Sequence, residues 1–134
     1  MITFEEKDQY VISVDNEKNR IILDFGECND PGKIPHYNHH VREAIKKVKR
    51  DFSVIALITE KTKPPKFALT KILKESQLDI IDAGVGKTAI IVPPKSILQK
   101  LTLQVVTKLT GMDLKVFSER KQAETWLDEK EDML

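Results

Sequence analysis

Apolar and polar residues alternate along two short stretches near the start of the chain, residues 10–14 and 21–25. An alternation with a period of two places every apolar side chain on one face of a pleated strand. The intervening residues 15–19 are polar and typical of a turn. The pattern therefore predicts an antiparallel hairpin with one apolar face turned toward a core.

The rest of the chain alternates between short apolar runs and helical spacing. Residues 53–58 and 88–92 are apolar almost throughout, as in strands covered on both faces, and residues 114–117 predict a shorter strand. Apolar residues three and four positions apart predict helices between and after these strands. The expected helices cover residues 37–50, residues from Pro64 and Pro65 to a stop at Gly84, residues from Pro93 and Pro94 to Gly111, and residues from a cap at Ser118 to Leu127.

This order of elements predicts a single α/β domain over residues 1–134, in the order β-β-α-β-α-β-α-β-α. Strands that alternate with helices imply right-handed crossovers and a largely parallel sheet. The initial hairpin adds an antiparallel edge. We therefore expect a mixed sheet of four to five strands.

The composition narrows the class of protein. The 134 residues are 40% hydrophobic and 32% charged, which suits one globular domain whose core needs no disulfide or metal. The net charge of +1 provides no global field that would attract nucleic acid or an acidic membrane. The first residues lack the pattern of a secretory signal, and Cys28 is the single cysteine. We expect a cytoplasmic protein without stable membrane insertion and without a cofactor.

The passage Gly84-Val85-Gly86-Lys87-Thr88 invites comparison with a phosphate-binding loop. That loop needs another glycine five residues before Gly86, where this chain has Ile81. The expected order, a helix before the passage and a strand after it, is also reversed, so no helix N-terminus would face a phosphate. We expect Gly84 to end a helix and Gly86 to ease the start of a strand.

Three histidines, His36, His39 and His40, cluster where the first helix is expected to begin. His36 and His40 are four positions apart and could share a metal ion, with Asp30 and Cys28 as further ligands, but this spacing is not diagnostic. We expect surface histidines at a helix start and no metal, and we expect Cys28 to be a small apolar loop residue.

A basic stripe follows the polar face of the same helix, and Glu43 partly offsets its charge. Its members are Arg42, Lys46, Lys49 and Arg50. Because no aromatic residues interleave with the stripe to stack on bases, we expect a solvated helix face and no nucleic-acid partner.

Three landmarks carry a resemblance to a known family. They are the polar turn at residues 16–19, the passage at residues 84–89, and the ending at residues 116–127, a strand followed by an Ala-x-x-Trp-Leu helix. With the order of the elements, they resemble the SpoIIAA-like branch of the STAS superfamily over nearly the whole chain. The resemblance implies a non-enzymatic regulatory or protein-interaction domain that docks on a partner protein.

The resemblance also implies two more specific roles. Anti-sigma-antagonist members carry a phosphorylatable serine in an Asp-Ser-x-Gly segment after the third strand. The matching residues 59–65 hold no such segment, and Thr62 is the hydroxyl nearest to that place, so Thr62 is a phosphorylation candidate on a poor match. Other relatives hold apolar or lipid-like ligands. The alternative function is therefore a carrier or sensor of a small apolar ligand, with an aliphatic pocket of ~300 Å³ or more.

Ligands of open α/β sheets gather at the carboxyl ends of the parallel strands. The expected rim for a partner or ligand consists of Thr59, Glu60, Lys61, Thr62, Lys95, Ser96 and Ser118. Taken one by one, these hydroxyl residues could simply cap or flank helices. No pattern of nucleophile, acid and base predicts an enzyme, which would need titratable groups with perturbed pKa values in a cleft. The sequence leaves a homodimer open.

Overall fold

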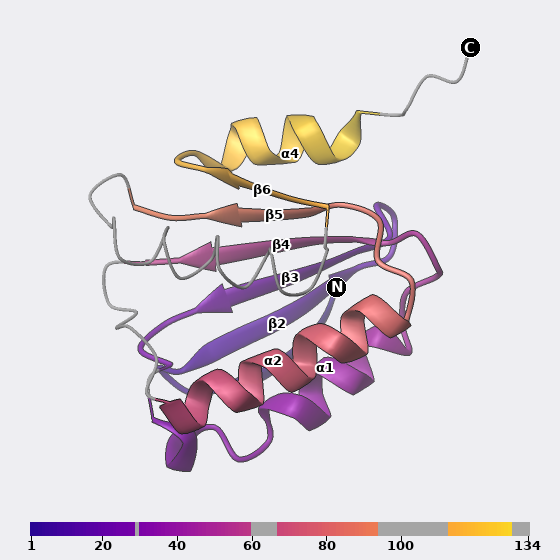
Figure 1. Cartoon of the computed structure of the whole chain (residues 1–134). Coiled ribbons are helices and arrows are strands. Elements are labelled where there is room, and N and C mark those ends of the chain that lie inside the picture. Colours follow the sequence, from indigo (N-terminus) through magenta and orange to yellow (C-terminus); the bar gives the residue numbers. More distant parts are fainter. Residues whose placement is uncertain (29, 60–66, 94–112, 130–134) are drawn as a thin grey trace.

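A mixed six-stranded sheet forms the centre of the molecule, with the strands side by side in chain order (Figure 1). The computed structural model describes residues 1–28, 30–59, 67–93 and 113–129. The strands are β1 (Ile2–Glu6), β2 (Tyr10–Asp15), β3 (Arg20–Phe25), β4 (Ser53–Ile58), β5 (Thr88–Ile91) and β6 (Leu114–Phe117). Strands β1 to β3 are antiparallel, and β3 to β6 are parallel. The predicted α/β class and the mixed sheet are confirmed.

The sheet has one strand more than the four to five that the sequence predicts, because β1 pairs with β2 along its whole length. Only Phe4 of β1 packs against the core, so the strand shows little of the alternation that marks β2 and β3. An edge strand that buries one side chain gives almost no periodic signal.

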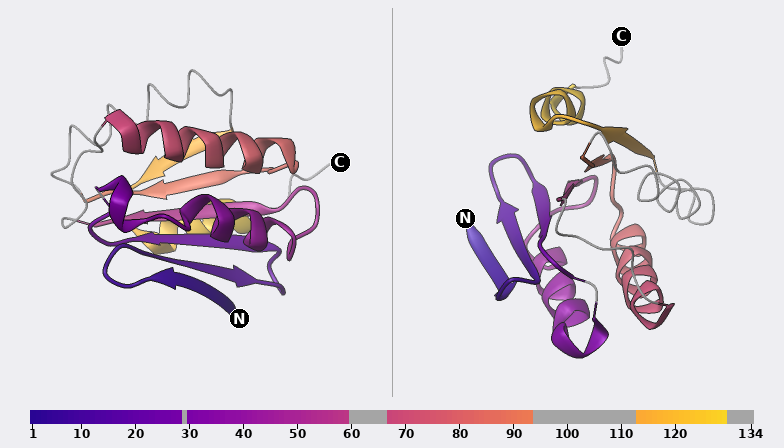
Figure 2. Two further views of the ribbon diagram at one scale, coloured as in Figure 1. Left: turned by 90° about the horizontal axis from the view of Figure 1, so that it is seen from below. Right: turned by 90° about the vertical axis from the view of Figure 1, so that its left-hand side faces the viewer.

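The helices cover the two faces of the sheet unequally (Figure 2). They are the short 3-10 helix η1 (Pro31–Lys33), α1 (Tyr37–Ile45), α2 (Phe67–Asp82) and α4 (Arg120–Asp128). In the left-hand view α1 and α2 lie in front of the strands and α4 lies behind them. The predicted helix from Pro93 and Pro94 to Gly111 lies almost wholly outside the described residues. None of the described helices is both long enough and apolar enough to span a bilayer.

Each face of the sheet carries its own cluster of buried side chains, as the pleat requires. Ile12, Ile21 and Phe52 are fully buried beneath α1 and α2. On the other face, Ile55 packs with Ala123 and Leu127 of α4.

Helix α1 ends five residues earlier than predicted, at Ile45 rather than residue 50. The Asn19 side chain accepts a hydrogen bond from the Lys49 backbone N–H at 2.8 Å and donates one to the Lys49 carbonyl at 3.0 Å. Asp51 then adopts a left-handed conformation with φ 71°. These contacts from the β2–β3 turn replace the helical hydrogen bonds that the periodicity alone would continue.

Candidate functional site

The structure describes two residues of the rim that the sequence predicts. Thr59 follows β4 and Ser118 follows β6, so both lie at the carboxyl ends of parallel strands. Strand β5 lies between these two strands. Glu60, Lys61, Thr62, Lys95 and Ser96 lie outside the described residues. The proposed rim and the phosphorylation candidate Thr62 therefore stay predictions.

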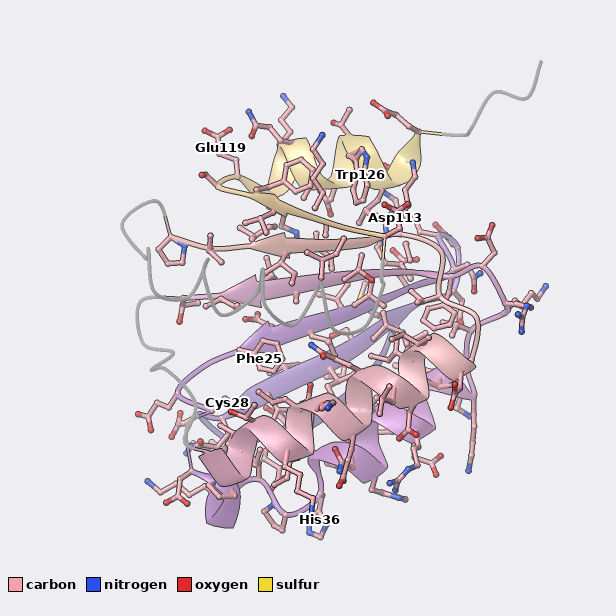
Figure 3. The ribbon with its side chains drawn as sticks, in the orientation of Figure 1. Phe25, Cys28, His36, Asp113, Glu119 and Trp126 are labelled. Carbon is pink, nitrogen blue, oxygen red and sulfur yellow. The ribbon has the colours of Figure 1, made fainter. Side chains whose placement is uncertain are left out.

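The expected cap of the last helix is one residue further along the chain. Glu119, not Ser118, is the N-cap residue of α4, and no side chain caps the helix there. Figure 3 places Glu119 at the start of α4 and Trp126 further along the same helix. Ser118 lies in the bend before the helix and is exposed.

The glycine passage before β5 has a structural explanation. Gly84 has φ +93° and follows the end of α2, as its predicted role as a helix stop requires. Lys87 donates hydrogen bonds to the carbonyls of Trp126 and Glu129, at 3.2 and 3.3 Å. The lysine thus binds carbonyls at the C-terminal end of α4, where a cation is favourable.

A connected group of titratable side chains lies where the start of α1 meets strands β1 and β2. Tyr10 Oη lies 2.7 Å from Glu6 Oε1 and 2.7 Å from His40 Nδ1. The same carboxylate oxygen accepts a hydrogen bond from the His36 backbone N–H at 2.9 Å. Three elements, β1, β2 and the start of α1, are therefore joined through Glu6 and Tyr10.

Aromatic rings enclose this group. Phe4 stacks on His40 with ring centroids 5.6 Å apart, and Tyr37 meets Tyr10 edge-on at 5.0 Å. Burial is the main cause that raises the pKa of both tyrosines, and hydrogen bonding to Glu6 raises the pKa of Tyr10 further. Burial also raises the pKa of Cys28 to about 11. These groups stay protonated at neutral pH, which is the opposite of an activated nucleophile.

His40 differs from its neighbours because its pKa is lowered, mainly by burial and also by His36 and His39, while Glu6 opposes the shift. Figure 3 shows His36 beside the start of α1 and Cys28 near the carboxyl end of β3. Among the described residues, no three His, Cys, Asp or Glu side chains are arranged to hold a metal ion.

The predicted basic stripe does not form one helix face, because α1 ends at Ile45 and only Arg42 of the four basic residues lies on it. Arg42 pairs with Asp79 of α2 at 3.3 Å, and Lys46 pairs with Glu43 at 3.2 Å. The Arg50 side chain lies against Gly84. The offset by Glu43 was expected, but Asp79 was not, because only the packing of α1 on α2 brings it near.

The sheet face opposite α1 and α2 is covered over half its width. Helix α4 packs against β4, β5 and β6. The strand register places residues of β1, β2 and β3 on that same face. They are Thr3, Glu5, Val11, Ser13 and Asp24. Thr3, Glu5 and Asp24 are exposed, and Val11 and Ser13 are half-buried. We call this surface, with Asp8 and Glu27 at its carboxyl end, the open face.

The open face is acidic. Glu5, Asp8, Asp24 and Glu27 form no ion pair within the part of the chain that the structure describes, and Lys7 is the basic residue in the adjoining β1–β2 turn. A shallow hollow of about 210 Å³ lies at its end. The hollow is lined by Asp8, Tyr10, Val11, Asp24, Gly26 and Glu27.

This hollow is not the aliphatic pocket that the ligand-carrier alternative requires, because three carboxylates line it. Residues 97–109, which would form one wall of an apolar pocket, lie outside the described residues. The carrier alternative therefore stays an untested prediction.

Neither the Glu6–Tyr10–His40 group nor the open face was predicted from the sequence. Glu6 and Tyr10 are 34 and 30 positions from His40 in the chain, and only the pairing of β1 with β2 brings them to α1. The acidic residues of the open face come from three segments. The signal that the sequence offered was the presence of the acidic residues Glu5 and Asp24 within strands β1 and β3.

Comparison with known proteins does not assign a family. A scan against models of protein families finds no match, and searches of curated proteins and of solved structures find none either.

Proposed function

We propose that this chain is a non-enzymatic protein-interaction module, and that its open face binds a lysine- or arginine-rich segment of a partner protein. The observation that carries the proposal is the half of this sheet face that no described helix covers. Its four carboxylates form no ion pair among the described residues, and three of them, Asp8, Asp24 and Glu27, line a hollow. A regulatory role of the STAS type is the wider proposal, and it rests on the resemblance in the sequence.

Charge complementarity supports a basic partner. Asp24 and Glu27 line the hollow from β3 and the residues after it, and Asp8 lines it from the β1–β2 turn. The three carboxylates that line the hollow can each accept a charge-assisted hydrogen bond from an ammonium or guanidinium group. Val11 adds apolar surface for the methylene stem of such a side chain.

The position of the face suits a binding role. It lies on β1–β3, and the backbone of these strands is fixed by antiparallel pairing and by the core on the far side. Glu5 and Asp24 lie on these strands, so their backbone loses little conformational freedom when a partner binds, compared with the backbone of loop residues. The catalytic alternative is weaker, because the clustered tyrosines and Cys28 hold their protons more tightly than usual.

The test is a charge reversal on the open face. A short lysine- and arginine-rich peptide carrying a fluorophore is titrated with the wild-type protein and with the variant Asp24→Lys/Glu27→Lys, and anisotropy is recorded. We expect the wild-type protein to bind and the variant to lose about tenfold or more in affinity, with binding that weakens as salt is added.

The matched control is Glu17→Lys/Asp82→Lys, which makes the same change in net charge at exposed residues of the β2–β3 turn and the end of α2. The control should bind almost as well as wild-type protein. An equal loss in both variants would show that only the overall charge matters, and this result would overturn the proposal.

A further inference from the structure

We infer that the histidines at the start of α1 form a pH-sensitive latch, in which protonation of His40 releases the first turn of α1 from the β1–β2 edge. The inference is independent of the proposed function. It rests on how the His40 ring is held, on which charges surround it, and on which contacts would be lost.

The His40 ring is held between two elements. Its Nδ1 atom is 2.7 Å from Tyr10 Oη, and Phe4 of β1 stacks on the ring. Since the Tyr10 hydroxyl has a single proton and also lies at 2.7 Å from Glu6, the simplest arrangement has His40 Nδ1–H donating to Tyr10 and Tyr10 donating to Glu6. The neutral imidazole then keeps Nε2 unprotonated as the site where a proton binds.

Burial makes that proton on His40 unfavourable, and the neighbouring histidines add to the effect. His36 and His39 lie with ring centroids 6.1 and 6.0 Å from His40, and all three rings sit at the N-terminal, positive end of α1. Glu6 on β1 and Glu43 on α1, at 4.0 Å from His39, are the nearby acidic groups. On the facing side, Tyr10, Tyr37 and Cys28 remain neutral.

The sign of the effect follows from the same surroundings. Burial lowers the pKa of His40 further than Glu6 raises it, so the unfolded or released state takes up the proton first. The attached state is therefore fully favoured above about pH 6.5, the ordinary pKa of histidine, and is weakened as the pH falls below it.

The contacts at risk are confined to the start of α1. The His36 backbone bond to Glu6 and the Phe4–His40 stack join this turn to β1. Helix α2 holds α1 on its other side, because Asn38 of the first turn donates a hydrogen bond to Glu75 at 3.2 Å and Arg42 of the next turn pairs with Asp79 at 3.3 Å. The expected change is thus a local opening and not a loss of the fold.

Hydrogen exchange measured by NMR tests the latch on the whole chain. The protection factors of the His40 and Val41 amides are compared between about pH 7.5 and about pH 5, with the β4 amides as an internal reference. We expect protection at the start of α1 to fall about tenfold for each unit by which the pKa of His40 lies below 6.5, with no such fall in β4.

Two variants separate the latch from general acid sensitivity. His40→Asn keeps a side-chain N–H near Tyr10 but cannot take up a proton, and should remove the pH-dependent loss of protection. His39→Gln changes an exposed histidine and should leave most of the loss in place. An unchanged loss in His40→Asn would overturn the inference. A direct NMR titration of wild-type protein that places the pKa of His40 at or above 6.5 would do so too, even if a variant fails to fold.

Discussion

Tyr10 of β2 joins three elements through its side chain. Its hydroxyl bonds Glu6 of β1 and His40 of α1, while its ring lies in the main core and meets Tyr37. A buried hydroxyl with two partners stabilises a fold mainly because its removal leaves both partners unsatisfied.

Tyr10→Phe should therefore destabilise the protein by about 1–3 kcal/mol, as measured by urea denaturation. The control is Tyr37→Phe, since the Tyr37 hydroxyl forms no hydrogen bond within the described residues and its ring stays in place. We expect a smaller effect from the control, below about 1 kcal/mol. Equal effects of the two substitutions would contradict the role given to the Tyr10 hydroxyl.

The reactivity of the Cys28 thiol can be predicted as well. Burial raises the pKa of its thiol to about 11, so almost no thiolate exists at neutral pH. A thiol reagent at about pH 8 should react far more slowly with native protein than with protein unfolded in urea, because the thiolate is the reactive species and the native thiol is also buried. Equal rates would show that Cys28 is accessible and activated.

At the scale of elements, the connection between α2 and β5 depends on backbone geometry. Gly84 has φ +93°, and a Cβ atom added there would lie 2.6 Å from Cγ of Arg50. Strain and a close contact therefore act together at this position.

Gly84→Ala should lower the free energy of unfolding by about 1 kcal/mol or more. Gly32→Ala in η1 is the matched control, since a Cβ there meets only Asp30 Oδ1 at 3.4 Å and the backbone needs no left-handed φ. If both substitutions prove equally mild in thermal denaturation, the assigned strain at Gly84 is wrong.

Helix α4 is attached to the sheet at its C-terminal end by an ion pair. Asp128 Oδ1 accepts a hydrogen bond from Arg20 Nη2 at 2.6 Å, and the Arg20 side chain is only 3% exposed. The Arg20 Nη1 atom is buried and has no hydrogen-bond partner among the described residues, so Asp128 is important for neutralising this charge.

Asp128→Asn should destabilise the protein by about 1–3 kcal/mol because it leaves a buried guanidinium without its counter-charge. Arg20 holds the pKa of Asp128 below its ordinary value, so this contribution is present above about pH 4 and is lost as the pH falls lower. Glu124→Gln removes the exposed pair with Arg120 and serves as the control. Trp126 fluorescence reports the release of α4, and a Glu124→Gln effect as large as that of Asp128→Asn would contradict this role.

The elements themselves were well predicted where a regular pattern repeats. Ile12, Val14 and Ile21 alternate along β2 and β3, and the structure buries them all. The end of α2 was predicted from Gly84. The prediction of helix ends failed where the end is set by local contacts and not by a repeating pattern. Helix α1 ends early, where Asn19 binds Lys49, and Glu119 replaces Ser118 as the cap residue of α4.

At the scale of the whole molecule, the sites depend on which strands become neighbours. Strand β1 was missed because Phe4 alone packs on the core, and its omission concealed both the open face and the Glu6–Tyr10–His40 group. The identity of a charged residue does not reveal which residue it will contact. Glu5 and Glu6 are identical in the sequence although their side chains lie on opposite faces of β1.

The buried thiol and the two buried tyrosine hydroxyls also affect the stability of the whole molecule at alkaline pH. Cys28, Tyr10 and Tyr37 keep their protons in the folded state beyond the ordinary pKa values of about 8.5 for cysteine and about 10 for tyrosine. The unfolded chain releases these protons first, so the free energy of unfolding should fall as the pH rises above about 9. Urea denaturation at several pH values checks this, and Tyr37→Phe should flatten the decline.

The central claim is that the open face is the binding surface, and chemical-shift mapping tests it most directly. The ¹⁵N-labelled protein is titrated with the lysine- and arginine-rich peptide, and amide shifts are followed residue by residue. We predict the largest changes at Asp8, Val11, Asp24 and Glu27, around the hollow. Changes centred instead on Thr59 and Ser118, at the carboxyl ends of β4 and β6, or on α2, would contradict the claim and place the interaction elsewhere.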